Sequence, residues 1–179
     1  MKNRSAIAAA LVAAVVAVFI VLLATSDTQQ TGAVNFEILG EVAPPIQGPT
    51  INAGDYSLQD QRGNWVVVNF FASWCVACRV EHPELVELSE RHPDGDVQIV
   101  GVMFADTEER AREFFDELGG DWPALVEETG SIAIDYGVTA VPETVLVSPS
   151  GRVVQKWLGA NGVTADEIDS VIDRLEAGG

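Results

Sequence analysis

The chain has 179 residues, which suits one domain, and carries 27 acidic against 10 basic residues, a formal net charge of −17. This acidic excess argues against nucleic-acid partners and against attraction to anionic lipid headgroups, because both need a surplus of lysine and arginine. Hydrophobic residues make up 47% of the chain, which excludes a disordered acidic tail. Only two cysteines are present, three positions apart, so a small domain stapled by several disulfides is excluded too.

An unbroken run of 19 apolar residues occupies positions 6–24. As a helix it would reach about 28 Å, close to the ~30 Å hydrocarbon core of a bilayer. Lys2 and Arg4 precede the run and the next basic residue is Arg62, so the positive-inside rule places the rest of the chain outside the cytoplasm. We interpret residues 1–24 as a single-pass anchor in the cell membrane. A cleaved signal peptide, leaving a secreted or periplasmic protein, is the alternative.

The remaining chain is interpreted as a polar tether over residues 25–39 and one folded domain over 40–177. In chain order, hydrophobic patterns predict a strand at 65–71, a helix at 75–91, a strand at 97–104, a helix at 106–118, a short helix at 131–136, strands at 145–147 and 153–157, and a helix at 164–175. Asp106 and Glu109 have the spacing of a capping box at the second helix. This order predicts an α/β domain whose parallel central sheet gains antiparallel strands from the closing hairpin.

The two cysteines, Cys75 and Cys78, stand where the first predicted strand turns into a helix. The N-terminus of a helix presents free N–H groups and the positive end of the helix dipole, and both stabilise an anion. Cys75 should therefore favour its thiolate, which is the form that attacks disulfides. Cys78 follows one turn later and can resolve the mixed disulfide that results. The pattern predicts Cys75 as nucleophile and Cys78 as resolving cysteine, joined by a redox-active disulfide.

Other uses of a cysteine pair fit the sequence less well. A zinc site with His82 and His92 would depart from the usual ligand spacing, so no metal is expected. A purely structural disulfide would close so small a loop that it restricts the unfolded chain little. A peroxidatic cysteine would need proline and a hydroxyl residue where Val68 and Ala72 stand. A redox-active dithiol that needs no other cofactor remains the favoured interpretation.

Two motifs, VVNFFASWCVACRVEHP at residues 67–83 and GVTAVPET at 137–144, carry a family resemblance. Over residues 40–177 the chain resembles the thioredoxin superfamily, and within it the extracytoplasmic thiol-disulfide oxidoreductases of the TlpA/ResA/CcmG (DsbE) type. The resemblance implies a thioredoxin-like fold with a central mixed β-sheet flanked by helices and an N-terminal transmembrane helix. It also implies an inserted helix within residues 106–121, after the second core strand.

The resemblance assigns roles to further residues. Pro142 matches a cis-proline that faces the dithiol, so that the backbone of Val141 can pair with a substrate chain. Glu81 matches a glutamate thought to tune the cysteines and to relay protons. Glu143 resembles an acid of the cytochrome c maturation branch, where its charge would raise the pKa of the thiols. Trp74 borders the site and is expected to pack beneath a docked substrate, with a core role as the alternative.

The implied function is that of a protein-disulfide reductase for exported proteins. Its expected substrates are the haem-attachment thiols of apocytochromes c, and an integral-membrane donor would supply its electrons. The Val76-Ala77 dipeptide lacks the proline that the family often carries between the cysteines, which leaves the direction of electron flow open. An exported thiol oxidase that introduces disulfides, a metallochaperone or metal-binding module, and an anchored domain with an inert disulfide are the other hypotheses.

Overall fold

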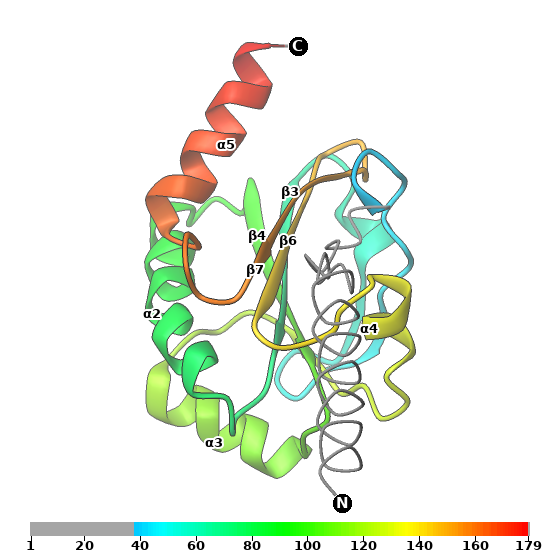
Figure 1. The fold of residues 1–179 in the computed structure, drawn as a ribbon, viewed down its shortest axis with the longest axis vertical. Helices are drawn as coiled ribbons and strands as arrows, with labels where there is room; N and C mark the ends of the chain where they lie inside the picture. The colour runs from blue at the N-terminus through cyan, green and yellow to red at the C-terminus, as the bar shows by residue number, and fades with distance from the viewer. Residues whose placement is uncertain (1–37, 179) are drawn as a thin grey trace, which may run out of the picture. The chain divides into compact units, whose positions relative to one another are not determined.

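A five-stranded mixed sheet with strand order β5-β4-β3-β6-β7 forms the centre of the folded domain (Figure 1). The computed structural model describes residues 38–178. The strands are β3 (Trp65–Phe71), β4 (Val97–Met103), β5 (Ala124–Leu125), β6 (Glu143–Val147) and β7 (Val153–Leu158). β3, β4 and β5 run parallel, whereas β6 is antiparallel to both β3 and β7. The mixed sheet predicted from the sequence is confirmed, but the two-residue strand β5 was not predicted because so short a strand shows no periodicity.

Helices cover both faces of this sheet. The helices are α2 (Val76–Arg91), α3 (Glu108–Leu118), α4 (Ser131–Asp135) and α5 (Ala165–Ala177). In Figure 1, α2, α3 and α5 lie on one side of the sheet and α4 lies on the other. Every residue of β3 is buried, as a strand covered on both faces requires. The alternation of side chains along the strands therefore builds two apolar cores, one on each face.

The helix α3 lies where a helix was expected after the second core strand, but its first turn differs from the prediction. Its N-cap is Thr107, whose side chain accepts a hydrogen bond from the Arg110 amide at 3.4 Å. Asp106, predicted as the cap, instead accepts a hydrogen bond from the Ser73 amide at 2.6 Å. The helix therefore begins one residue later than predicted and the capping box is wrong, because Asp106 makes a tertiary contact that sequence spacing cannot show.

A small hairpin precedes the central sheet and was not predicted. It pairs β1 (Gln47–Pro49) with β2 (Asp55–Ser57), and a 3-10 helix, η2 (Leu58–Gln61), follows it. Thr50 also forms an isolated bridge with Leu125, so the hairpin covers the free edge of β5. Strands of three residues carry too little pattern to be recognised in a sequence, and β1 also contains glycine and proline, which are rare in strands.

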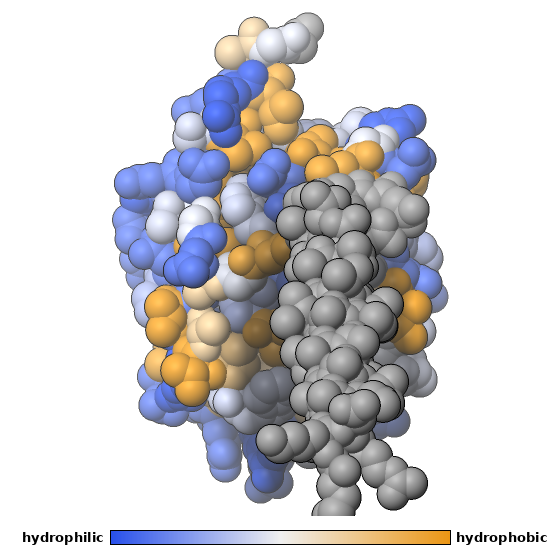
Figure 2. Space-filling view, viewed as in Figure 1, coloured by the Kyte–Doolittle hydropathy of each residue, from blue (hydrophilic) through white to orange (hydrophobic). Residues whose placement is uncertain are grey.

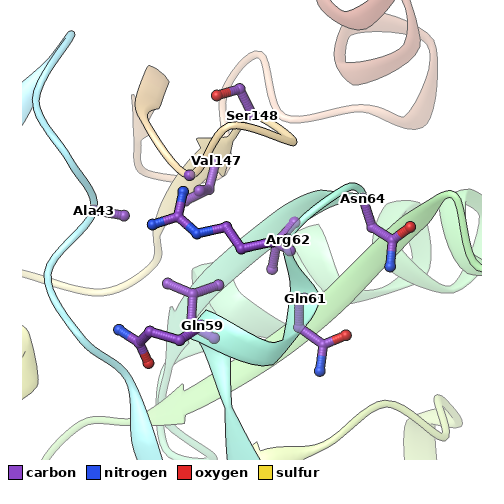
Figure 3. A pocket seen from close by; sticks show the side chains of 10 residues that line it. Ala43, Gln59, Gln61, Arg62, Asn64, Val147 and Ser148 are labelled. Carbon is purple, nitrogen blue, oxygen red and sulfur yellow. The ribbon is translucent and has the colours of Figure 1, made fainter.

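A small cavity of about 10 Å³ lies under the turn between β6 and β7. Figure 3 shows the side chain of Arg62 close to Ala43 and Val147 in its lining. Arg62 donates a hydrogen bond to the carbonyl oxygen of Ser150 and so ties the segment before β3 to this turn. The cavity lies at the C-terminal end of β6, whereas Glu143 lies at the start of that strand. It is a structural feature of the fold, since its lining contains no cysteine or other redox-active group.

The predicted membrane span at residues 6–24 and nearly all of the predicted tether at 25–39 lie outside the described residues. Among residues 38–178, none of the helices is both long enough and apolar enough to cross a membrane.

Candidate redox site

The site is built where β3 ends and α2 begins. Cys75 is the N-cap of α2 and forms a disulfide with Cys78, which lies in the first turn of the helix. The Cys78 amide donates a hydrogen bond to Cys75 Sγ at 3.1 Å. After reduction the same donor, together with the helix dipole, would stabilise a thiolate on Cys75. The structure therefore places both cysteines where the sequence predicted them, in the geometry that the predicted chemistry needs.

The second motif forms the loop that faces the disulfide. The Val141–Pro142 peptide bond is cis, which confirms the cis-proline expected from the resemblance. The carbonyl oxygen of Val141 lies 3.4 Å from Cys75 Sγ, so the backbone of this loop borders the nucleophile directly. A substrate chain that pairs with Val141 would bring its own sulfur toward Cys75.

Three exposed apolar side chains stand next to the two cysteines in the chain. Trp74 is 55% exposed and is not part of either core, and its Nε1–H donates a hydrogen bond to the Ala105 carbonyl at 3.1 Å. Val76 and Val80, on the outer face of α2, are exposed as well, and Figure 2 shows hydrophobic surface over this helix. Exposed apolar groups beside a reactive group indicate a docking surface. Contact between Trp74 and a substrate remains a prediction.

Glu81 follows Cys78 by one turn and points into the protein. It is only 2% exposed. Thr144 donates a hydrogen bond to its Oε1 at 2.6 Å, and Asn69 Nδ2 lies 3.4 Å from its Oε2 and 2.9 Å from Thr144 Oγ1. Burial raises the pKa of Glu81 to about 7, although the hydrogen bonds from Thr144 and Asn69 act in the opposite direction. A carboxyl group that titrates near neutral pH suits the proton relay expected of Glu81.

Glu143 is also buried, but it has a cationic partner that the sequence did not reveal. Lys156 Nζ lies 2.8 Å from Glu143 Oε2, and the side chains of both residues are almost wholly inaccessible. One sequence feature could have indicated this partner: Lys156 is the only lysine after residue 2, and it stands inside an apolar strand. Its meaning depended on the pairing of β6 with β7, which places Lys156 opposite Val145 and so on the same face as Glu143.

The two histidines weighed as zinc ligands have other partners. His82 Nε2 lies 2.7 Å from the Gly119 carbonyl oxygen, and burial lowers the pKa of His82. The two ring nitrogens of His92 lie 3.2 Å from Asp96 and 3.0 Å from Asp169. Across residues 38–178, no three or more histidine, cysteine or acidic side chains are grouped in a way that could hold a metal ion.

Comparison with known proteins identifies the family. The model of the AhpC/TSA family matches residues 39–156. The thiol:disulfide interchange protein HelX of Rhodobacter capsulatus is 38% identical over 151 residues, which cover 84% of this chain and 77% of HelX. The chain belongs to the AhpC/TSA family. A DsbE homologue of Paracoccus denitrificans, also named a thiol:disulfide interchange protein, is 40% identical over 68% of this chain and 67% of its own length.

Solved structures of this thioredoxin-like group agree with the fold. The thioredoxin domain of a thiol-disulfide oxidoreductase from Bacteroides vulgatus superposes with a TM-score of 0.67 at 26% identity, covering 76% of this chain and 96% of that domain. The relatives and the Cys75–Cys78 disulfide together establish the reaction class of this AhpC/TSA family member. It is a thiol-disulfide oxidoreductase.

Proposed function

We propose that this protein is a membrane-tethered reductase that works outside the cytoplasm and keeps the haem-attachment thiols of apocytochromes c reduced. The proposal depends above all on one observation, the Cys75–Cys78 disulfide at the start of α2 facing the cis-proline loop. Similarity to interchange proteins named HelX and DsbE supports it, as does the Pro142-Glu143 pair that resembles the cytochrome c maturation branch.

The proposed reaction passes two electrons from the dithiol to a substrate disulfide. The Cys75 thiolate attacks one sulfur of the substrate, a mixed disulfide forms, and the other substrate sulfur leaves as a thiolate. Cys78 then gives up its proton and attacks Cys75 Sγ, which releases the second substrate thiol and leaves the Cys75–Cys78 disulfide. Glu81, one turn further along α2, is the proposed acceptor of that proton. The reaction needs no cofactor beyond the two cysteines.

The proposed location rests on the sequence of the N-terminal segment. Residues 6–24 would anchor the protein in the cell membrane, with residues 25–39 as the tether and the domain over 40–177 on the extracytoplasmic side. A dithiol held there has no cytoplasmic thiol pool to reduce it. An integral-membrane electron donor that reduces Cys75–Cys78 is therefore part of the proposal.

Trapping tests the substrate. In a Cys78→Ser variant the mixed disulfide cannot be resolved, so adducts through Cys75 should accumulate on the full-length protein in membrane fractions. Mass spectrometry should then identify c-type apocytochromes joined through their haem-attachment cysteines. The matched variant Cys75→Ser, which retains only the less accessible cysteine, should trap none of them. An adduct-free Cys78→Ser protein would indicate an inert disulfide.

The reduction potential tests the direction of electron flow. Equilibration of the full-length protein with thiol redox buffers should give a value near that of thioredoxin, about −270 mV. A value close to about −120 mV, which is typical of a strong oxidant, would instead support a thiol oxidase that introduces disulfides. Zinc or copper bound at one equivalent, with unfolding on its removal, would favour the metal-binding hypothesis.

A further inference from the structure

We propose that the buried pair Lys156–Glu143 is a positioning device that holds the cis-proline loop, residues 136–142, against Cys75 for the capture of a substrate chain. Sequence resemblance suggested a different role for Glu143, as a charge that acts on the thiols. The new role goes beyond the proposed function and holds for either direction of electron flow, because both directions pass through the same mixed disulfide.

Lys156 binds the beginning of the loop. Besides its ion pair with Glu143, its ammonium group donates hydrogen bonds to the carbonyl oxygens of Tyr136 at 2.9 Å and Gly137 at 3.1 Å. The ammonium group thus contacts three oxygen atoms, two through hydrogen bonds and one through the ion pair. The carbonyl groups at the end of α4 would otherwise lack these donors, so Lys156 connects that end of α4 to the edge strand β7.

Glu143 binds the middle of the loop. Its Oε1 accepts hydrogen bonds from the Thr139 amide at 2.9 Å, from the Thr139 hydroxyl at 3.2 Å and from the Ala140 amide at 3.2 Å. Its Oε2 faces Lys156. One buried ion pair thus fixes both ends of the segment that leads into Val141, whose carbonyl oxygen lies 3.4 Å from Cys75 Sγ.

The strand register separates this ion pair from the dithiol chemistry. Glu143 lies opposite Phe70 and Lys156 opposite Val145, so the pair belongs to the α4 face of the sheet. Thr144, the next residue, points to the other face and contacts Glu81 under α2. Because Lys156 compensates the charge of Glu143 at 2.8 Å, their combined field falls off faster with distance than that of a lone carboxylate.

The burial of this pair also points to positioning. Desolvating two charges is costly, and apolar residues of similar size often give equal or greater stability. An ion pair retained in a buried place therefore suits a task that apolar contacts do less well, namely fixing the direction of backbone groups. The carbonyl and amide groups of residues 136–140 are the groups held here.

Two variants of the full-length protein test the proposal. The double variant Glu143→Gln/Lys156→Met removes both charges at similar volume and leaves no single buried charge behind. Thr139→Val removes one hydroxyl donor to Glu143 at an exposed position. Thr129→Val is the matched control, since Thr129 is also exposed and also bonds to a glutamate, but outside the cis-proline loop.

Each variant is compared in two reactions. The first is reduction of a peptide disulfide by the reduced protein, which needs the loop; the second is alkylation by iodoacetamide over a range of pH, which reports only on the thiolate. We expect the double variant to lose roughly 10- to 100-fold in the rate constant with the peptide, as small misplacements do in positioned reactions. Thr139→Val should lose less, Thr129→Val should match the wild type, and the alkylation profile should not move in any of them.

Two results would overturn the proposal. One is an alkylation profile that moves to lower pH when Glu143 is neutralised, which would show that its charge acts on the thiols. The other is a peptide rate within about two-fold of the wild type in the folded double variant. If that variant does not fold, Thr139→Val decides the question alone, and an unchanged peptide rate would refute the positioning role.

Discussion

Replacing Glu81 with glutamine should alter the stability of the oxidised protein in a way that depends on pH. Compared with the wild type, the variant should be more favoured at neutral pH than in acid. The buried carboxyl has its pKa raised from 4.5 to about 7, chiefly because burial penalises the charged form. The folded protein therefore binds this proton more tightly than the unfolded chain does. The resulting stabilisation is fully present below about pH 4.5 and is lost as the pH rises toward 7.

The size of the effect follows from the shift. One pKa unit corresponds to 1.36 kcal/mol, so a shift of this size costs the folded state about 3 kcal/mol once Glu81 is ionised in both states. Glutamine cannot ionise and escapes this cost. Its own effect, such as an imperfect contact with Asn69, should be independent of pH. The stability difference between variant and wild type should thus change by about 3 kcal/mol, in favour of the variant, between pH 4.5 and 8.

Chemical denaturation of the oxidised full-length protein at several pH values would measure this difference. Glu90→Gln is a suitable control, because Glu90 is an exposed glutamate on the same helix. Its stability difference from the wild type should vary little with pH. A pH-independent difference for Glu81→Gln would refute the reasoning, since it would show that the buried carboxyl titrates at an ordinary value.

Three further predictions concern the central sheet, the C-terminal end of α2 and the contact between Asp106 and Ser73. Gly101→Ala should destabilise the fold by about 1–3 kcal/mol in denaturant, because the added Cβ would lie 2.9 Å from the Phe71 ring; unchanged stability would show that the ring moves freely. Burial lowers the pKa of His92, but its hydrogen bonds, first of all with Asp169, outweigh this and raise it above 6.5. The stability that His92 adds relative to His92→Gln should be complete below pH 6.5 and decline as the pH rises further, and a constant difference would contradict this. Asp106→Asn weakens the acceptor for the Ser73 amide, which lies just before the active site. This variant should reduce peptide disulfides several-fold more slowly than the wild type. A rate equal to that of the wild type would show that the contact is dispensable.

Much of the site was predictable because its chemistry is local. Cys75 and Cys78 share one helical turn, and Pro142 stands in a short motif, so neither needed tertiary information to be recognised. The partners of the two acids were not predictable in this way. Thr144 lies 63 residues from Glu81 in the chain, and Lys156, the partner of Glu143, lies on the neighbouring strand β7. Such contacts depend on which strands are neighbours, and periodicity does not contain that information.

The sequence by itself determined the order of the longer helices and strands and the position of the dithiol at a helix N-terminus, and it favoured an oxidoreductase. Tertiary structure decided what the acids do. Glu143 and Thr144 are consecutive, yet the pleat sends one to Lys156 on the α4 face and the other to Glu81 under α2. The physical reason is that a side chain's partner depends on strand register. A shift of one residue would exchange the two faces and separate both acids from their partners.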